Sequence, residues 1–252
     1  MVEAARPAAP PRTPGQRALS FLKEVLVILV VATVLSFVLK TWVVQSFWIP
    51  SGSMRTTLME HDRVAVSKLT PRVTDLDRGD VIVFEDPGGW HEGSLPEQPP
   101  TALHPLTDAL AWIGLLPTDE GTFLIKRIIG MPGDRVVCCT VDGRVSVNGT
   151  PITETYVAAG EAPSLIPFDI TVPPDRVWVM GDNRGHSGDS RMHDGPTEGS
   201  GPGTGVTGSV PMAAITGRAV VIMWPLNHLR WLGTPSEVFS QVPEPTGARP
   251  AS

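Results

Sequence analysis

The sequence predicts a mainly β protein with antiparallel sheets, preceded by one N-terminal transmembrane helix. Three observations support this fold class. An uncharged apolar run occupies residues 25–39, and after it short apolar or alternating runs recur with no long helical pattern between them. Two dipeptides typical of tight hairpins, Asp142-Gly143 and Asn148-Gly149, lie among these runs. Strands that follow one another without long helices favour antiparallel pairing.

The first element is a helix expected at 21–43. Its uncharged run alone is slightly short for a bilayer, but apolar residues extend it on both sides, and Lys23 and Lys40 can reach the two interfaces. Residues 1–20, which are rich in Ala, Pro and Arg, are predicted to be a disordered tail. The chain is therefore expected to cross the cell membrane once.

The distribution of basic residues predicts the orientation of this helix. Four basic residues, Arg6, Arg12, Arg17 and Lys23, precede the uncharged run, whereas only Lys40 and Arg55 follow it closely, which favours a cytoplasmic N-terminus and an extracytoplasmic body. The alternative is a cleavable secretory signal. Residues 44–46 (VQS) are a weak cleavage match, but bulky Phe47 and Trp48 follow at once. A retained anchor is the preferred interpretation.

Residues 44–232 are expected to form the β body. The two hairpin signals predict a small meander across 135–153, which forms a smaller inserted β region. Two polar or Gly-rich segments, 88–118 and 192–209, are expected to be loop inserts, the first with one short helix at 106–116, and 233–252 a disordered tail. Predicted strands lie at 63–68, 80–85, 122–129, 135–141, 144–147, 176–180 and 217–224.

Composition excludes several classes of function. The net charge of −6 argues against nucleic acid as a partner. No cluster of residues has metal-ligand spacing, and no cofactor is predicted. The only cysteines are adjacent, Cys138 and Cys139. Neighbouring residues on a strand point to opposite faces, so a disulfide between them would be strained, and two ordinary strand side chains are favoured over a redox switch.

Ser53 and Lys126 are the candidate catalytic residues. Ser53 lies on a tight turn after Gly52, and Lys126 lies in an apolar strand between Ile125 and Ile128. Lysine is rare here, with four among twenty basic residues. A desolvated lysine can become neutral and act as a base, which arginine cannot do. The pair predicts a serine hydrolase with a lysine base; the alternative is an ordinary strand lysine directed to water.

Five ordered sequence blocks resemble those of bacterial type I signal peptidases, the membrane-anchored Ser/Lys proteases that remove signal peptides from exported proteins. The resemblance runs from the apolar helix to about Trp224. It implies an antiparallel-sheet catalytic domain of the signal peptidase type, and cleavage after a small-x-small motif. The blocks are IPSGSM at 49–54, DRVAV at 62–66, RGDVIVF at 78–84, FLIKRIIGMPGD at 123–134 and GDNRGHSGDSR at 181–191.

The resemblance also implies roles for single residues. Ser53 would be the nucleophile and Lys126 its general base, while the backbone N–H of Ser53 and the hydroxyl of Ser51 would form the oxyanion hole. Ser187 resembles the serine that orients the lysine. Five further residues of the last block would give structural support: Asp182, Asn183, Arg184, Asp189 and Arg191.

Substrate binding is implied in the same way. An extended signal peptide would pair with strand segments beside Ser53, and shallow apolar pockets would admit only small side chains. Apolar residues near Phe47 and Trp48 would touch the lipid surface. The expected partners are signal peptides of secreted preproteins, membrane lipids and the nearby export machinery, with no nucleic acid. The residues expected to bind substrate are Ile49, Pro50, Met54, Leu58, Leu124 and Ile125.

One departure from the family pattern stands out. The serine block commonly continues Met-x-Pro-Thr-Leu, but Thr56 stands here in place of the proline. Losing the proline frees one φ angle and one N–H, so a looser turn is expected.

Three alternatives remain open. A Ser-His-Asp hydrolase would draw its base from His61, His186 or His193. A self-cleaving repressor with Ser/Lys chemistry would carry a DNA-binding domain, whereas this chain has an apolar helix and an acidic balance. A non-enzymatic peptide-binding module is supported only by Thr56.

Overall fold

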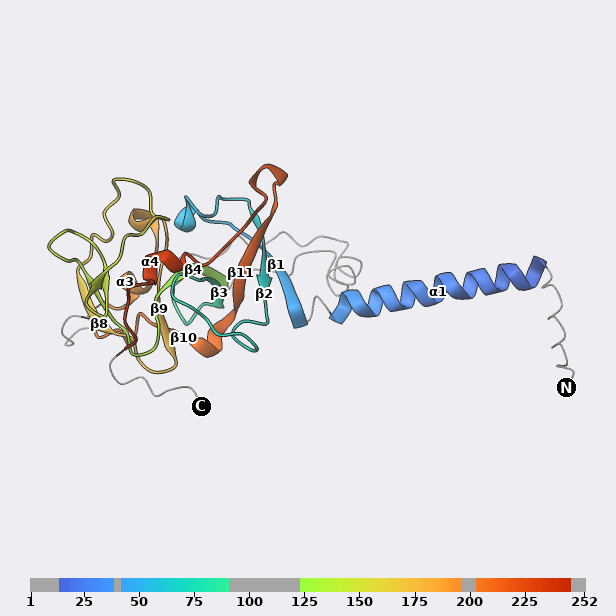
Figure 1. Ribbon diagram of the computed structural model, residues 1–252, viewed down its shortest axis with the longest axis horizontal. Helices are drawn as coiled ribbons and strands as arrows, with labels where there is room; N and C mark the ends of the chain where they lie inside the picture. The colour runs from blue at the N-terminus through green and yellow to red at the C-terminus, as the bar shows by residue number, and fades with distance from the viewer. Residues whose placement is uncertain (1–13, 39–41, 91–122, 196–202, 246–252) are drawn as a thin grey trace, which may run out of the picture.

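A long helix stands apart from a two-sheet β body (Figure 1). This computed structural model describes residues 14–38, 42–90, 123–195 and 203–245. Helix α1 (Pro14–Val38) contains the span Leu19–Phe37, which is long and apolar enough to cross a membrane and has no buried residue. The predicted membrane helix is therefore confirmed as an apolar helix, and its exposure is consistent with an anchor.

The N-terminal limit of this helix differs from the prediction. It begins at Pro14, so residues 14–20 are helical rather than part of a disordered tail. Proline suits a first helical turn because its φ is already helical and its missing N–H has no partner there. The described part of the helix runs to Val38, residues 39–41 lie outside the described residues, and strand β1 begins at Val44, so the predicted C-terminal limit at 43 stays a prediction.

The larger sheet is antiparallel throughout, with strand order β1-β2-β11-β3-β4-β9-β10 and with β12 paired to β11. Strand β4 lies inside this sheet, between β3 and β9, and carries Lys126. The sequence missed β1, β10 and β12. The strands are β1 (Val44–Trp48), β2 (Arg63–Ser67), β3 (Val81–Glu85), β4 (Phe123–Gly130), β9 (Arg176–Met180), β10 (Val210–Pro211), β11 (Ile215–Trp224) and β12 (Arg230–Trp231).

The smaller sheet has the order β7-β6-β5-β8 and confirms the predicted second β region. It comprises β5 (Arg135–Cys138), β6 (Ser146–Val147), β7 (Thr150–Pro151) and β8 (Phe168–Thr171). Asn148 and Gly149 have φ of 51° and 81° between β6 and β7, as a two-residue hairpin of type I′ requires. The turn at Gly143 joins β5 to β6. Strand β8 was not predicted.

The prediction for the two cysteines is wrong. Cys138 is the last residue of β5, so the alternation of faces along a strand does not extend to Cys139. The two residues are joined by a cis peptide bond and form a vicinal disulfide.

Most of the segment predicted to be a disordered C-terminal tail is ordered and packs on the body. Helix α4 (Ser236–Phe239) buries Phe239, and Val242 is buried in the same apolar cluster as the smaller sheet. The amide of Asn148 donates to the Pro243 carbonyl at 2.8 Å. The apolar contacts of Phe239 and Val242 hold this segment on the body. Residues 233–245 of the predicted tail are described, and 246–252 lie outside the described residues.

The two inserts differ in what can be seen. Most of 88–118, including the helix expected at 106–116, lies outside the described residues. Part of the Gly-rich insert is ordered, against expectation, because its hydrogen-bond donors bind the buried carboxylate of Asp194. Asp194 accepts hydrogen bonds from the backbone N–H groups of Gly205 (2.7 Å) and Gly208 (3.1 Å) and from the Thr207 hydroxyl (3.0 Å). The remaining short helices are η2 (Gly52–Met54), η3 (Arg184–His186), α3 (Ser190–His193), η4 (Met212–Ala214) and η5 (Leu226–His228).

Candidate active site

Ser53 lies in the short helix η2, on the loop that joins β1 to β2. The loop closes on itself through two backbone hydrogen bonds, from Ile49 N–H to the Asp62 carbonyl (3.0 Å) and from His61 N–H to the Ile49 carbonyl (2.9 Å). Met54 and Leu58 are fully buried beneath it. The apolar anchors and the backbone closure together fix the position of Ser53 against the sheet.

Lys126 reaches Ser53 from the middle of β4. Its Nζ donates to the Ser53 hydroxyl at 2.6 Å, and only 3% of the residue is exposed. Burial lowers the pKa of Lys126 to about 8, against the opposing attraction of the Asp189 carboxylate. The alternative of a strand lysine directed to water is therefore wrong. A base with this pKa is neutral in a usable fraction of molecules near neutral pH.

Ser51 lies on the same turn as Ser53. Their hydroxyl oxygens are 3.4 Å apart, and Ser51 is exposed at the surface. A carbonyl group attacked by Ser53 would therefore meet the Ser51 hydroxyl nearby. The place of Ser51 in an oxyanion hole stays a prediction.

The predicted contact between Ser187 and Lys126 is not formed. Ser187 is buried, and its hydroxyl is directed to the Asp189 carboxylate, whose pKa it helps to lower, rather than to Lys126. It packs instead against Gly181, where an added Cβ would collide with the Ser187 hydroxyl and lie 2.5 Å from the Ser53 carbonyl oxygen. Ser187 is therefore packed next to the site through Gly181. The amino group of Lys126 is directed to Ser53 instead.

Asn183 holds the serine turn directly. Its backbone N–H donates to the Ser53 carbonyl at 3.0 Å, and its side-chain amide donates to the Gly52 carbonyl at 2.8 Å. The sequence predicted a structural supporting role for Asn183, and the structure shows that the atoms it binds are these two carbonyl oxygens. Two hydrogen bonds to consecutive carbonyls restrict the orientation of the turn.

Asp182 and Asp189 are each paired with a buried arginine. Asp182 accepts two hydrogen bonds from Arg127, at 2.8 and 2.7 Å, and Asp189 accepts two from Arg191, at the same distances. Burial opposes ionisation of Asp189, but its hydrogen bonds from Arg191 outweigh this and keep the pKa of the carboxyl below its usual value. Asp189 also accepts from the Gly181 N–H at 2.9 Å, which places it next to the Ser53 turn.

Arg184 ties a further segment to this corner. It donates to the Gly181 carbonyl at 3.0 Å and to both carboxylate oxygens of Glu154, at 2.6 and 2.5 Å. The hydroxyl of Tyr156 also donates to Glu154, at 2.9 Å, and its ring lies 4.1 Å from the Arg127 guanidinium. Sequence reasoning missed Arg127, Glu154 and Tyr156. Only Arg127 carried a signal, since it is a second cation in the apolar strand of Lys126.

Four of the six predicted substrate-binding residues gather beneath the turn. Ile49, Met54, Leu58 and Ile125 belong to one buried apolar cluster. Pro50 is exposed beside them. Leu124 is partly buried and packs against a different cluster, which contains Phe84 and Ile128, on the same face of β4 as Lys126; its role in substrate binding stays a prediction.

The three candidate histidines have other contacts. His193 stacks on Trp90 at 4.5 Å and its Nδ1 lies 2.9 Å from the Asp189 carbonyl oxygen, while His61 meets Trp48 edge-on. His186 is exposed at the end of η3. Within the described ranges, the Ser53 hydroxyl is hydrogen-bonded to Lys126 and lies near Ser51, with no histidine in contact. A Ser-His-Asp arrangement is therefore not supported.

Residues 22–224 match the model of the signal peptidase family, peptidase S26. The chain belongs to this family. It is 39% identical over 233 residues to signal peptidase I of Mycobacterium tuberculosis strain H37Rv, covering 84% of this chain and 75% of that protein. It is 36% identical over 236 residues to probable signal peptidase I of Mycobacterium leprae (86% and 80% covered), and 34% over 229 residues to signal peptidase I of Leptolyngbya laminosa (91% and 93%).

These findings confirm the family that the five sequence blocks indicated and the prediction of a peptidase. In a signal peptidase of this family, the buried Ser53–Lys126 pair, which lies within the matched residues, is the candidate catalytic pair.

Proposed function

We propose that this protein is a serine endopeptidase that removes N-terminal signal peptides from exported preproteins, with Ser53 as nucleophile and Lys126 as general base. The observation that carries the proposal is the 2.6 Å hydrogen bond between a buried lysine and a serine hydroxyl on a fixed turn. A serine hydroxyl is a poor nucleophile until an adjacent base takes its proton. In this site Lys126 is the group in position to do so.

The reaction proceeds in two halves. Neutral Lys126 takes the proton of Ser53 as its oxygen attacks the scissile carbonyl carbon, and a tetrahedral oxyanion forms. The protonated lysine then gives its proton to the departing amine, which leaves an acyl-enzyme ester on Ser53. Water, deprotonated in turn by neutral Lys126, hydrolyses the ester and restores both groups.

The oxyanion is stabilised by donors on the same turn. The backbone N–H of Ser53 and the hydroxyl of Ser51 are the proposed donors, and the 3.4 Å between the two serine oxygens supports the second assignment. Donors held in advance near a developing negative charge typically supply the largest catalytic contribution. The grip of Asn183 on the Gly52 and Ser53 carbonyls keeps these donors in place.

Substrate selection follows from the apolar residues under the turn. The signal peptide terminus would lie extended beside residues 49–51 and 122–125, pairing its backbone with theirs. Met54, Leu58 and Ile125 form a filled apolar layer with Ile49. Because these residues are already buried against one another, we expect little room beside them, so that small side chains are favoured at the −1 and −3 positions of the substrate.

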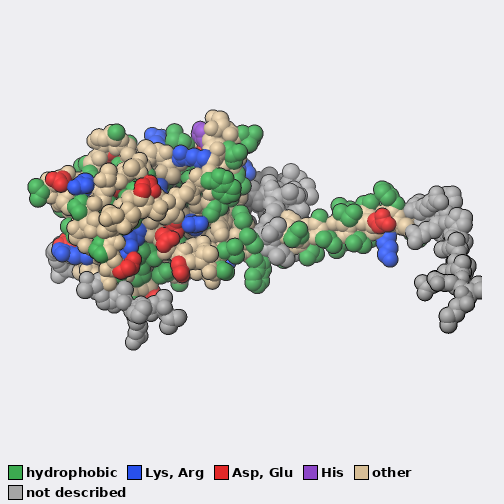
Figure 2. Space-filling model, viewed as in Figure 1, with side chains coloured by type: hydrophobic (Ala, Val, Ile, Leu, Met, Phe, Trp, Pro, Cys, Tyr) green, Lys and Arg blue, Asp and Glu red, His purple; other side chains and the backbone are tan. Residues whose placement is uncertain are grey.

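The catalytic body is proposed to work at the outer face of the cell membrane, close to the export machinery, with the N-terminus in the cytoplasm. Hydrophobic side chains cover α1 and gather on the adjoining side of the β body (Figure 2). Trp48 is exposed as expected, although Phe47 is buried, and the neighbouring hairpin adds exposed Trp224 and Trp231. Aromatic side chains suit the membrane interface.

The test is cleavage of a preprotein whose signal peptide ends in Ala-x-Ala, by the full chain in detergent. Cleavage after the −1 alanine is expected, and it should be lost in Ser53→Ala and in Lys126→Ala. Ser240→Ala, which changes an exposed serine of the C-terminal segment, serves as the control. Binding of the preprotein without turnover by the wild-type chain would refute the proposal in favour of a peptide-binding module.

A further inference from the structure

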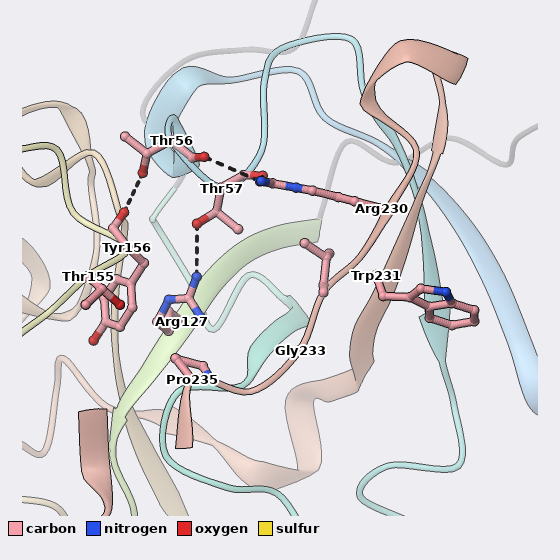
Figure 3. Close-up of a pocket in the computed structure, with 10 residues that line it drawn as sticks. Thr56, Thr57, Arg127, Thr155, Tyr156, Arg230, Trp231, Gly233 and Pro235 are labelled. Atoms are coloured by element: carbon pink, nitrogen blue, oxygen red, sulfur yellow. Dashed lines mark hydrogen bonds between the residues drawn. The ribbon is translucent and has the colours of Figure 1, made fainter. Parts of the chain in front are cut away.

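The turn that follows Ser53 borders a cavity on one side. The cavity has a volume of about 300 Å³ and is lined by Thr56 and Thr57, by Tyr156, and by residues 230–233 and Pro235 (Figure 3). Residues on the other side of the turn, such as Met54 and Leu58, are packed in the apolar cluster. Apolar packing therefore holds the turn from one side only, and polar contacts must hold it from the other.

The backbone of this turn is strained at Thr56. Thr57 N–H donates to the Met54 carbonyl at 3.0 Å, and Thr56 has a φ of 87°. A β-branched residue at positive φ is costly and persists only where its surroundings impose it. Proline cannot adopt this φ. The turn therefore differs in shape from one containing proline, rather than being a loosened version of it as the sequence suggested.

Besides Arg127 and Asp182, which bind the Thr57 hydroxyl, two further groups from distant segments hold the strained turn. The hydroxyl of Thr56 donates to the Tyr156 carbonyl at 2.5 Å. The guanidinium of Arg230, which comes from β12, donates to the Thr57 carbonyl and lies 3.4 Å from the Thr56 carbonyl (Figure 3). In the part of the chain that the structure describes, no carboxylate forms an ion pair with Arg230. Its charge is thus directed to two carbonyls of the serine turn.

The same hairpin also holds the far end of the loop. His228 Nδ1 lies 2.7 Å from a carboxylate oxygen of Asp62, which is buried and accepts from the Met59 N–H at 2.9 Å. The hairpin itself is fixed to the sheet by pairing of Arg230 with Ile222 in β11. One hairpin therefore contacts the 54–62 loop at both ends.

We infer that Arg230 is a positioning residue for the peptidase reaction, which holds the Ser53 turn through the carbonyls of Thr56 and Thr57 while His228 holds Asp62. The inference rests on the proposed role of Ser53 as nucleophile. Proton transfer and attack tolerate little displacement of the reacting groups. Release of the turn should therefore slow the chemical step, while the apolar residues that bind substrate stay in place.

The first test compares Arg230→Ala, Arg230→Lys and wild type as full chains in detergent with the Ala-x-Ala preprotein. For Arg230→Ala we expect kcat to fall about 10- to 100-fold and KM to change less than about 3-fold. Arg230→Lys keeps a cationic donor and should recover part of kcat. Arg135→Ala is the matched control, since it removes an exposed arginine whose partner, Asp169, lies in the smaller sheet.

The second test follows amide hydrogen exchange and needs no activity. The N–H groups of Thr57 and Leu58 both donate to the Met54 carbonyl, at 3.0 and 2.8 Å. Their exchange should be about tenfold faster in Arg230→Ala and unchanged in Arg135→Ala and Ser53→Ala. An inactive wild-type chain would refute the proposed function, yet exchange would still decide this inference. Unchanged exchange, or faster exchange across the whole body, would overturn it.

Discussion

The two faces of β4 carry adjacent buried cations with opposite surroundings. On one face Lys126 donates to the Ser53 hydroxyl, and its long-range attraction to Asp189 does not offset the effect of burial. On the other face Arg127 donates to Asp182, the Gly79 carbonyl and the Thr57 hydroxyl. One strand thus holds a base that can lose its charge next to a cation that cannot.

The difference shows how the same degree of burial gives opposite results. Burial with a hydroxyl as partner lowers the pKa of Lys126 to about 8. Burial also opposes the charge of Arg127, but the hydrogen bonds that its guanidinium donates to Asp182 outweigh this and leave the pKa of Arg127 raised. Arg127 is therefore suited to fixing structure and Lys126 to moving protons.

The largest expected effect comes from replacing Lys126 with arginine, so that both faces of β4 carry a side chain that stays charged. Lys126→Arg keeps a long cationic side chain but removes the ability to become neutral. We expect kcat to fall about 10³-fold or more, because base catalysis on Ser53 is lost. Steady-state cleavage of the Ala-x-Ala preprotein measures this, with circular dichroism as the check on folding. A variant that retains more than about a tenth of the activity would show that Lys126 is not the base.

Removing the partner of Arg127 should instead affect stability. Asp182→Ala leaves a buried guanidinium without its carboxylate, and breaking such a pair costs about 3–5 kcal/mol. The matched control is Asp169→Ala, which breaks an exposed pair with Arg135 and should cost less than about 1 kcal/mol. Urea unfolding of both variants gives the comparison. Equal losses would mean that burial does not distinguish the two pairs.

The sequence predicted the chemical face of β4 better than the structural one. Lys126 could be found because lysine is rare in this chain and lies in an apolar strand. The partners of Arg127 could not, since Asp182 and Tyr156 come from distant segments and their contacts depend on folding. Helix α4 was missed for a related reason: four residues carry no helical periodicity, and the burial of Phe239 decides their conformation.

The Lys126 face should also respond to pH. Only the neutral amine can accept the Ser53 proton, and the neutral fraction rises as pH passes the pKa of about 8. We therefore expect kcat/KM to rise about tenfold per pH unit below that value and to level above it. Rates measured across this range with the Ala-x-Ala preprotein test the expectation. A profile that is flat below pH 8 would contradict a lysine base.

The smallest effect concerns Thr56, on the Arg127 side of the turn. Thr56→Gly removes the cost of a β-branched residue at a φ of 87°, but also loses the hydrogen bond to the Tyr156 carbonyl. A strain of about 1–3 kcal/mol is set against about 0.5–1.5 kcal/mol for the bond and about 0.5–1 kcal/mol for glycine entropy. Stability should therefore change by only about 1 kcal/mol.

Thr56→Pro sharpens the same comparison. Proline fixes φ near about −65°, so it cannot occupy this turn without moving Thr57 and its contact with Arg230. We expect a loss of about 2–3 kcal/mol in urea unfolding together with a lower kcat. If Thr56→Pro proved as stable and active as wild type, the positive φ would not be needed. The polar side of the turn would then contribute nothing to the position of Ser53, and the role inferred for Arg230 would fall with it.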